Sequence, residues 1–136
     1  METKLNTTDL MRGNWIDING PVKVLEVRQI SVIVEYEIEG KRKVSNVPIE
    51  NIQPIPLSEL WLEKLGFKYD EVFDRYYWYI PLHDLATEKL TFRVSEGFIC
   101  FDGIKYRTLL KHVTFVHQAQ NLMSALKQPL TFKISE

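Results

Sequence analysis

The chain has 136 residues, of which 45% are hydrophobic and 12% aromatic, a composition that supports a folded core and excludes a disordered chain. Its 17 Lys and Arg residues against 18 Asp and Glu residues give a formal net charge of -1, so the basic excess typical of nucleic-acid binders is missing. The single cysteine, Cys100, forms no internal disulfide, and its apolar neighbours predict a buried thiol.

Targeting signals are missing from the sequence as well. The first eight residues are polar, unlike the apolar core of a secretory signal. No run approaches the roughly 20 apolar residues that span a bilayer. We therefore expect a cytoplasmic protein without a membrane segment.

Residues 10–55 predict a meander of short strands. The pattern is cleanest at 32–38, where apolar positions alternate with glutamates, and the turn signal at 39–40 leads into the basic run 41–43. The opening Leu10–Ile16 is similar to the Leu-x-x-Gly-Asp/Asn-x-Val/Ile start of SH3-like barrels. These features predict a small SH3-like β-barrel lobe over residues 1–56.

A short helix follows this lobe. Pro54 and Pro56 favour extended backbone before it, Ser58 is suited to the N-cap, and Gly66 is suited to a left-handed residue after the last turn. The spacing of the apolar residues predicts one buried face, made of Leu57, Leu60, Trp61 and Leu65.

Residues 57–136 predict an α+β lobe that contains this connecting helix, an antiparallel sheet and one long helix. Strands are expected around a turn at 74–75 and at 89–94, and Asp102-Gly103 predicts a two-residue hairpin. Apolar residues at helical spacing predict the long helix at 114–127, followed by a terminal strand at 130–134. The two lobes are expected to pack together as one compact α+β unit.

Two segments in this order resemble a known family. Ile52–Phe67 and Val113–Leu126 are similar to the motifs PIPLT-x-x-WL-x-x-x-GF and VHQLQNLYFAL of small uncharacterised proteins from Bacteroidales genomes and their phages or mobile elements. The chain departs from that family at Met11-Arg12, at Ala119 and at 127–129. The family has no established activity, so the resemblance implies a mobile-element context and supplies no mechanism.

Catalytic and metal-binding patterns are not found in the sequence. The three histidines and the cysteine lack the spacing of a zinc motif, and no phosphate-binding glycine loop or nucleophile elbow occurs. We therefore expect a non-enzymatic protein with no catalytic residue, cofactor or metal.

Two groups of side chains are candidates for a binding surface. His117, Gln120 and Asn121 share one face of the long helix, and they either bind a partner or stitch the helix to a neighbouring strand, the simpler interpretation. Tyr76 and Trp78 share one face of an aromatic strand, and they either stack on the bases of a nucleic acid or fill the core and contribute to a protein-binding surface, the simpler interpretation.

The function expected from these observations is that of a phage or mobile-element accessory protein acting through contacts with a partner protein. The alternative is a nucleic-acid-binding module that uses the SH3-like lobe, which the charge does not favour. The sequence leaves the partner and the oligomeric state open.

Overall fold

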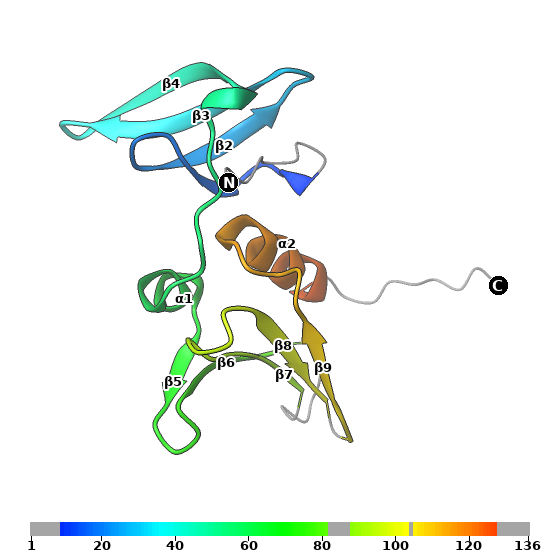
Figure 1. Cartoon of the computed structure of the whole chain (residues 1–136). Helices are drawn as coiled ribbons and strands as arrows, with labels where there is room; N and C mark the ends of the chain where they lie inside the picture. The colour runs from blue at the N-terminus through cyan, green and yellow to red at the C-terminus, as the bar shows by residue number, and fades with distance from the viewer. Residues whose placement is uncertain (1–8, 82–87, 104, 128–136) are drawn as a thin grey trace. The chain divides into compact units, whose positions relative to one another are not determined.

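The computed structural model describes residues 9–81, 88–103 and 105–127, which form antiparallel sheets and two α-helices, an α+β architecture (Figure 1). The chain divides into two compact units. Unit 1 consists of Met1–Pro56 and Phe115–Asn121, and unit 2 consists of Leu57–Thr114 and Leu122–Glu136. The strand expected at 130–134 lies outside the described residues.

Unit 1 is built on a four-stranded antiparallel meander in the order β1-β2-β3-β4. Its strands are β1 (Trp15–Asp17), β2 (Pro21–Val27), β3 (Ser31–Ile38) and β4 (Lys41–Pro48). Glu39 and Gly40 join β3 to β4 with φ values of 53° and 78°, the doubly left-handed turn that suits the twist of a two-residue hairpin. The acidic and basic runs therefore lie side by side, with Glu37 opposite Arg42.

Unit 1 also shows features that bend its sheet. The β2–β3 register shifts between Val24 and Glu26, an irregularity that increases local twist. After β4, the 3-10 helix η2 (Ile49–Asn51) leads to Gln53, which exchanges backbone hydrogen bonds of 2.9 and 3.0 Å with Asp17 of β1. Among the described residues the strands do not close into a barrel, because β4 pairs with β3 alone.

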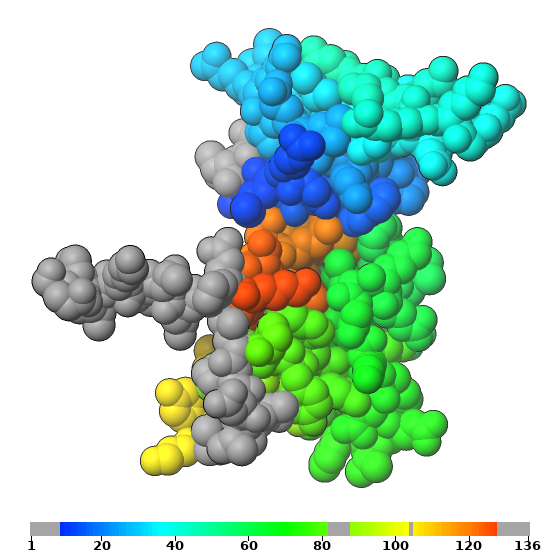
Figure 2. Space-filling model, turned by 180° about the vertical axis from the view of Figure 1, so that it is seen from behind, coloured from blue at the N-terminus to red at the C-terminus, as the bar shows by residue number. Residues whose placement is uncertain are grey.

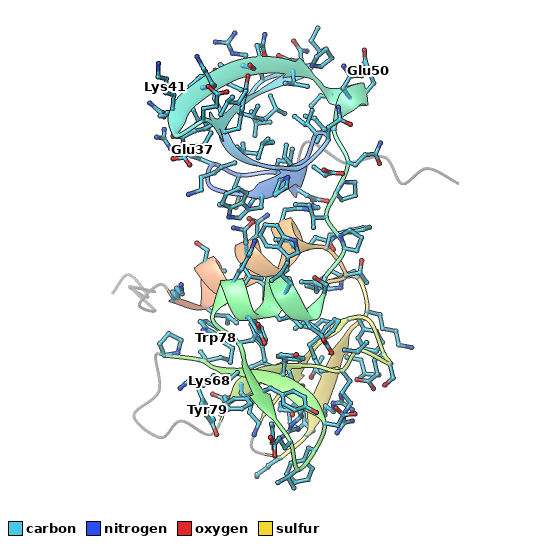
Figure 3. All side chains as sticks on the ribbon, turned by 90° about the vertical axis from the view of Figure 1, so that its left-hand side faces the viewer. Glu37, Lys41, Glu50, Lys68, Trp78 and Tyr79 are labelled. Atoms are coloured by element: carbon cyan, nitrogen blue, oxygen red, sulfur yellow. The ribbon has the colours of Figure 1, made fainter. Side chains whose placement is uncertain are left out.

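The core of unit 1 is aliphatic. Alternation along the strands directs one side chain in two inward, and Figure 3 shows the strands curving around these side chains. The buried cluster consists of Leu10, Ile16, Val22, Val24, Val32, Val34 and Ile52.

In unit 2, helix α1 (Glu59–Leu65) has the predicted ends. The Ser58 hydroxyl accepts a hydrogen bond from the Trp61 amide at 3.3 Å, and Gly66 closes the helix with φ of 102°. The predicted buried face was wrong at Leu60, which is 59% exposed, whereas Leu62 is fully buried. The buried side of this short helix runs through Trp61, Leu62 and Leu65, and Leu60 lies across the helix from it.

The sheet of unit 2 has five antiparallel strands in sequence order. They are β5 (Lys68–Asp70), β6 (Arg75–Tyr79), β7 (Lys89–Phe92), β8 (Ile99–Asp102) and β9 (Arg107–Leu110). The predicted two-residue hairpin at Asp102-Gly103 was wrong, because Asp102 pairs with Arg107 and the connection spans 103–106. The Gly103 amide donates to the Tyr106 carbonyl at 3.0 Å, so this longer loop supplies its own closing hydrogen bond.

Helix α2 (Val116–Lys127) contributes to both units, unit 1 up to Asn121 and unit 2 from Leu122 onward. It begins two residues after the predicted start, and the Gln118 side chain accepts the Phe115 amide at 3.1 Å in the manner of a capping box. In unit 2, Figure 1 shows α1 and the last turns of α2 on the same side of the five-stranded sheet. The buried apolar residues of unit 2 are Leu62, Phe67, Tyr76, Ile80, Leu90, Phe92, Ile99, Cys100, Val113 and Met123.

Candidate functional site

The side of the unit 1 sheet that faces away from its core carries a groove of about 430 Å³. We call it the outer groove, and it is lined by Trp15, Pro21, Lys23, Glu35 and Glu37, together with Tyr36, whose side chain points to the core face. Strand pairing explains its composition, because Lys23 lies directly opposite both Trp15 and Glu35. Residues of three strands therefore meet on one face, between the inward positions that build the core.

The charges of the outer groove are only partly compensated. The Glu35 carboxylate forms an ion pair with Arg42 of β4, and the Lys23 ammonium lies 5.4 Å from the centre of the Trp15 ring. Among the described residues, Glu37 enters no ion pair. The groove thus offers one aromatic ring, that of Trp15, and a proline on the same face as the exposed carboxylate of Glu37.

The predicted residues of α2 form a polar contact with the start of unit 1. The Gln120 side chain accepts the Trp15 amide at 2.8 Å and donates to the Gly13 carbonyl at 3.1 Å. The Asn121 side chain accepts from the Asn14 amide group at 2.8 Å and donates to the Asp9 carbonyl. These four hydrogen bonds join chain segments that are separated by more than 100 residues in the sequence. Both side chains therefore act within unit 1.

His117, in the part of α2 that belongs to unit 1, is a buried residue. It is 2% exposed, its ring stacks on Phe115 at 6.1 Å, and its Nδ1 has no hydrogen-bond partner among the described residues. Burial lowers the pKa of His117, an effect that nearby Asp9 opposes. The neutral imidazole is therefore the form that the folded unit favours.

The two predicted aromatic residues of β6 also point into a core. Tyr76 is 6% exposed, and Trp78 is half-buried, 6.4 Å from the Phe67 ring and 5.9 Å from the Lys127 ammonium. Figure 3 labels Trp78 near Lys68 and Tyr79 of the same sheet. Tyr77 and Tyr79, the alternate residues of β6, occupy its other face, where their rings meet edge to face at 5.4 Å.

That other face of the sheet carries an ionic network around the cysteine. Asp102 accepts a hydrogen bond from Arg75 at 2.9 Å, and its second oxygen lies 3.4 Å from Arg107 without hydrogen-bond geometry. Arg107 also donates to Glu96 and to the Cys100 sulfur, at 2.9 and 3.1 Å. Burial raises the pKa of the Cys100 thiol although Arg107 opposes the shift, so the group is a poor nucleophile at neutral pH.

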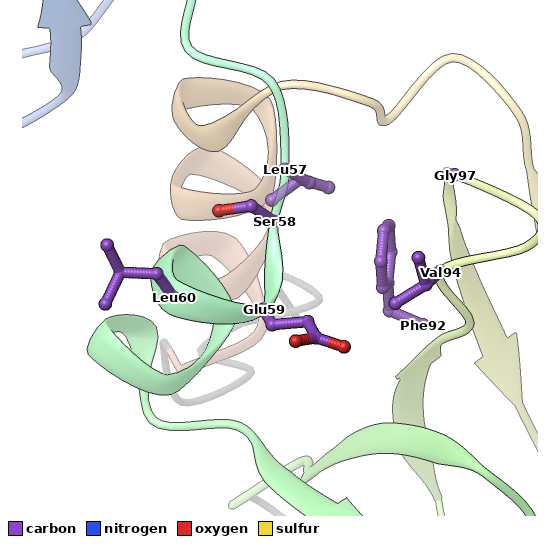
Figure 4. A pocket seen from close by; sticks show the side chains of 7 residues that line it. All are labelled: Leu57, Ser58, Glu59, Leu60, Phe92, Val94 and Gly97. Atoms are coloured by element: carbon purple, nitrogen blue, oxygen red, sulfur yellow. The ribbon is translucent and has the colours of Figure 1, made fainter.

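Unit 2 has a groove of its own, of about 430 Å³, between the start of α1 and the end of β7 (Figure 4). Leu57 points toward Phe92 across it, whereas Leu60 points away. The remaining lining consists of Ser58, Glu59, Val94 and Gly97. Its one charged group is Glu59, so it holds fewer specific features than the outer groove.

Within residues 9–81, 88–103 and 105–127, no group of three or more His, Cys, Asp or Glu side chains is arranged to hold a metal ion. The helices in this part of the chain are too short or too polar to cross a membrane. Comparisons with protein-family models, curated proteins and solved structures find no match.

Sequence reasoning did not identify the outer groove. Its signal was present in the alternation at 32–38, which places glutamates on the face away from the core. The missing information was the pairing that brings Trp15 and Lys23 beside Glu35, because register between strands is set by the folded sheet.

Proposed function

We propose that the protein is a non-enzymatic binding protein whose unit 1 holds an extended, proline-containing, basic segment of a partner protein. The observation that carries this proposal is the outer groove, where the Trp15 ring and Pro21 lie on the same face of the sheet as the carboxylate of Glu37. Aromatic side chains form flat apolar walls for proline rings, and an extended proline-rich chain loses little entropy on binding. A Lys or Arg of the partner then pairs with Glu37.

Three features support an SH3-like fold for unit 1 within this proposal. These are the opening at Leu10–Ile16, the bulge in β2, and the 3-10 helix that precedes the Gln53 bridge to β1. In a small barrel the last strand pairs with the first, and here the segment after the meander makes one such bridge to β1. The resemblance to Bacteroidales mobile-element proteins supplies the proposed context, an accessory protein of a phage or integrated element.

Binding of nucleic acid by the same lobe is the competing function. The exposed basic run of β4 is the observation in its favour. Against it, β4 lies beside the acidic strand β3, and Arg42 is already paired with Glu35. The groove carboxylates repel phosphates, so we favour a basic peptide as the ligand.

The test is fluorescence anisotropy of the full chain with a labelled ten-residue peptide of alternating proline and arginine. We expect saturable binding, and we expect Glu37→Lys to weaken it at least about tenfold because the charge is reversed inside the groove. Glu50→Lys is the matched control, an exposed acidic residue at the opposite end of unit 1 from Glu37 (Figure 3).

Two further probes complete the experiment. A lysine-glycine peptide of equal charge should bind more weakly, because it lacks rigid proline rings to pack on Trp15. Equal loss of binding in Glu37→Lys and Glu50→Lys would show general charge attraction and contradict the proposal. Tight binding of a labelled single-stranded oligonucleotide at low salt, with no peptide binding, would favour the nucleic-acid function instead.

A further inference from the structure

The turn between β5 and β6 holds two apolar side chains in water. Val72 is 84% exposed and Phe73 is 57% exposed, and Figure 1 shows this turn as one of the tips of the sheet. We call Asp70–Asp74 the hairpin tip. Two adjacent exposed apolar residues at the end of a hairpin are a feature typical of contact surfaces.

The hairpin tip is held in a defined conformation by its own hydrogen bonds. Asp70 accepts the Val72 amide at 3.0 Å, and the Tyr69 hydroxyl donates to Asp74 at 2.6 Å, a bond that raises the pKa of Tyr69 to about 12. The Arg75 guanidinium lies 4.9 Å from the centre of the Phe73 ring. A preorganised tip loses little conformational freedom when it binds.

The hairpin tip is also acidic. Asp70, Glu71 and Asp74 flank the two apolar residues, and the nearest cation, Arg75, is engaged by Asp102 at 2.9 Å and lies 3.8 Å from Asp70. Glu71 enters no ion pair among the described residues. The tip therefore suits an apolar pocket with a basic rim.

Unit 1 contains a pocket of this kind. We call it the inner pocket, an opening of about 200 Å³ on the core side of the sheet, lined by Ile18, Val22, Val34, Tyr36, Ser45 and Val47. Its polar groups satisfy each other, since the Tyr36 and Ser45 hydroxyls are 2.8 Å apart. What remains for a ligand is an apolar cup large enough for one sizeable side chain.

The rim of the inner pocket is basic. Lys43 lies directly opposite Tyr36, and Lys41 lies opposite Ile38, which is 51% exposed. By strand alternation these lysines are on the same face as the pocket residues. Among the described residues neither lysine enters an ion pair. Figure 2 shows the β3–β4 hairpin (cyan) protruding from unit 1, so this end of the sheet is accessible.

We propose that the protein self-associates by inserting the hairpin tip of one copy into the inner pocket of a second copy. Phe73 enters the apolar cup, while Glu71 and Asp74 face Lys41 and Lys43 on the rim. The two surfaces match in both polarity and charge, and among the described residues Glu71, Asp74, Lys41 and Lys43 enter no ion pair. This contact uses the core side of the sheet, so it does not depend on peptide binding in the outer groove.

The contact joins two different patches, and this asymmetry makes the test sharp. Sedimentation velocity of the full chain over a concentration series should show reversible association. Phe73→Ala removes the aromatic ring of the hairpin tip. The double substitution Lys41→Glu, Lys43→Glu reverses the charge of the pocket rim. Each variant should raise the dissociation constant at least about tenfold, as expected when an anchor at the centre of an interface is lost.

Mixing the two variants gives the decisive measurement. The Phe73→Ala copy keeps its inner pocket and the rim variant keeps its tip, so the mixture should form one-to-one pairs although each variant alone stays monomeric. Tyr106→Ala is the matched control, because this ring is 73% exposed at another loop of the same sheet and should leave association unchanged. Thermal melts should show that all variants fold.

Three results would overturn the proposal. The first is a wild-type chain that stays monomeric at all accessible concentrations. The second is association that Phe73→Ala leaves intact. The third is a mixture of the two variants that fails to pair.

Discussion

The two units of this chain differ in the interactions that connect their distant segments. Unit 1 is completed by Phe115–Asn121, which binds residues 9–15 through the neutral amides of Gln120 and Asn121 around an aliphatic core. Unit 2 combines an aromatic-rich core with charged links between strands, centred on Asp102. The strength of hydrogen bonds between neutral amide groups depends on their geometry. The strength of the ionic contacts depends on how well opposite charges compensate one another.

The largest expected effect comes from the core of unit 2. Leu62→Ala should lower the free energy of unfolding by about 2 to 5 kcal/mol, because a fully buried side chain leaves a cavity. Leu60→Ala, in the same helix but 59% exposed, should change it by less than about 0.5 kcal/mol. Urea denaturation of both variants measures the difference, and equal effects would contradict the packing of α1.

The ionic network of unit 2 comes next. Asp102→Ala leaves Arg75 and Arg107 without their shared carboxylate, and we expect a loss of about 2 to 3 kcal/mol, reduced from a fully buried pair by partial exposure. Glu26→Ala is the control, because Glu26 and Arg28 pair with both side chains 55% exposed and should contribute at most about 1 kcal/mol. Chemical denaturation measures both variants. Equal losses in the free energy of unfolding would contradict the expected difference between a largely buried and an exposed ion pair.

The amide contacts of unit 1 should contribute somewhat less. Asn121→Ala removes two hydrogen bonds and leaves the side chain of Asn14, which is 3% exposed, without its acceptor. We expect a loss of about 2 kcal/mol, measured by thermal or urea unfolding. Ser124→Ala, at an exposed position of the same helix, should stay within about 0.5 kcal/mol of the wild type. An unchanged stability in Asn121→Ala would show that these hydrogen bonds add nothing to unit 1.

The smallest effect is a pH dependence located in unit 1. The folded state lowers the pKa of His117 below its ordinary value of 6.5, so the unfolded chain takes up the proton first as the pH falls. The stabilisation is complete above pH 6.5 and is lost as the pH drops through the folded pKa. Comparing urea midpoints of the wild type and His117→Gln between pH 7.5 and 5 isolates this term, which should disappear in the variant.

Local rules predicted the elements better than the surfaces. The N-cap at Ser58, the left-handed Gly66 and the hairpin at Glu39-Gly40 follow from backbone preferences of a few residues. The buried side of α1 and the loop at 103–106 did not, because packing against the sheet and pairing of β8 with β9 decided them. Asp102-Gly103 carried the right residues for a tight turn, but the register placed Asp102 opposite Arg107.

The sequence by itself determined the α+β class, the approximate positions of the unit 1 strands and of both helices, and the burial of Cys100, since alternation and capping act over short distances. Only the tertiary structure decided that α2 contributes its first half to unit 1, and that Trp15 and Glu37 line one groove. Those facts depend on contacts between residues far apart in the chain, which no local pattern encodes.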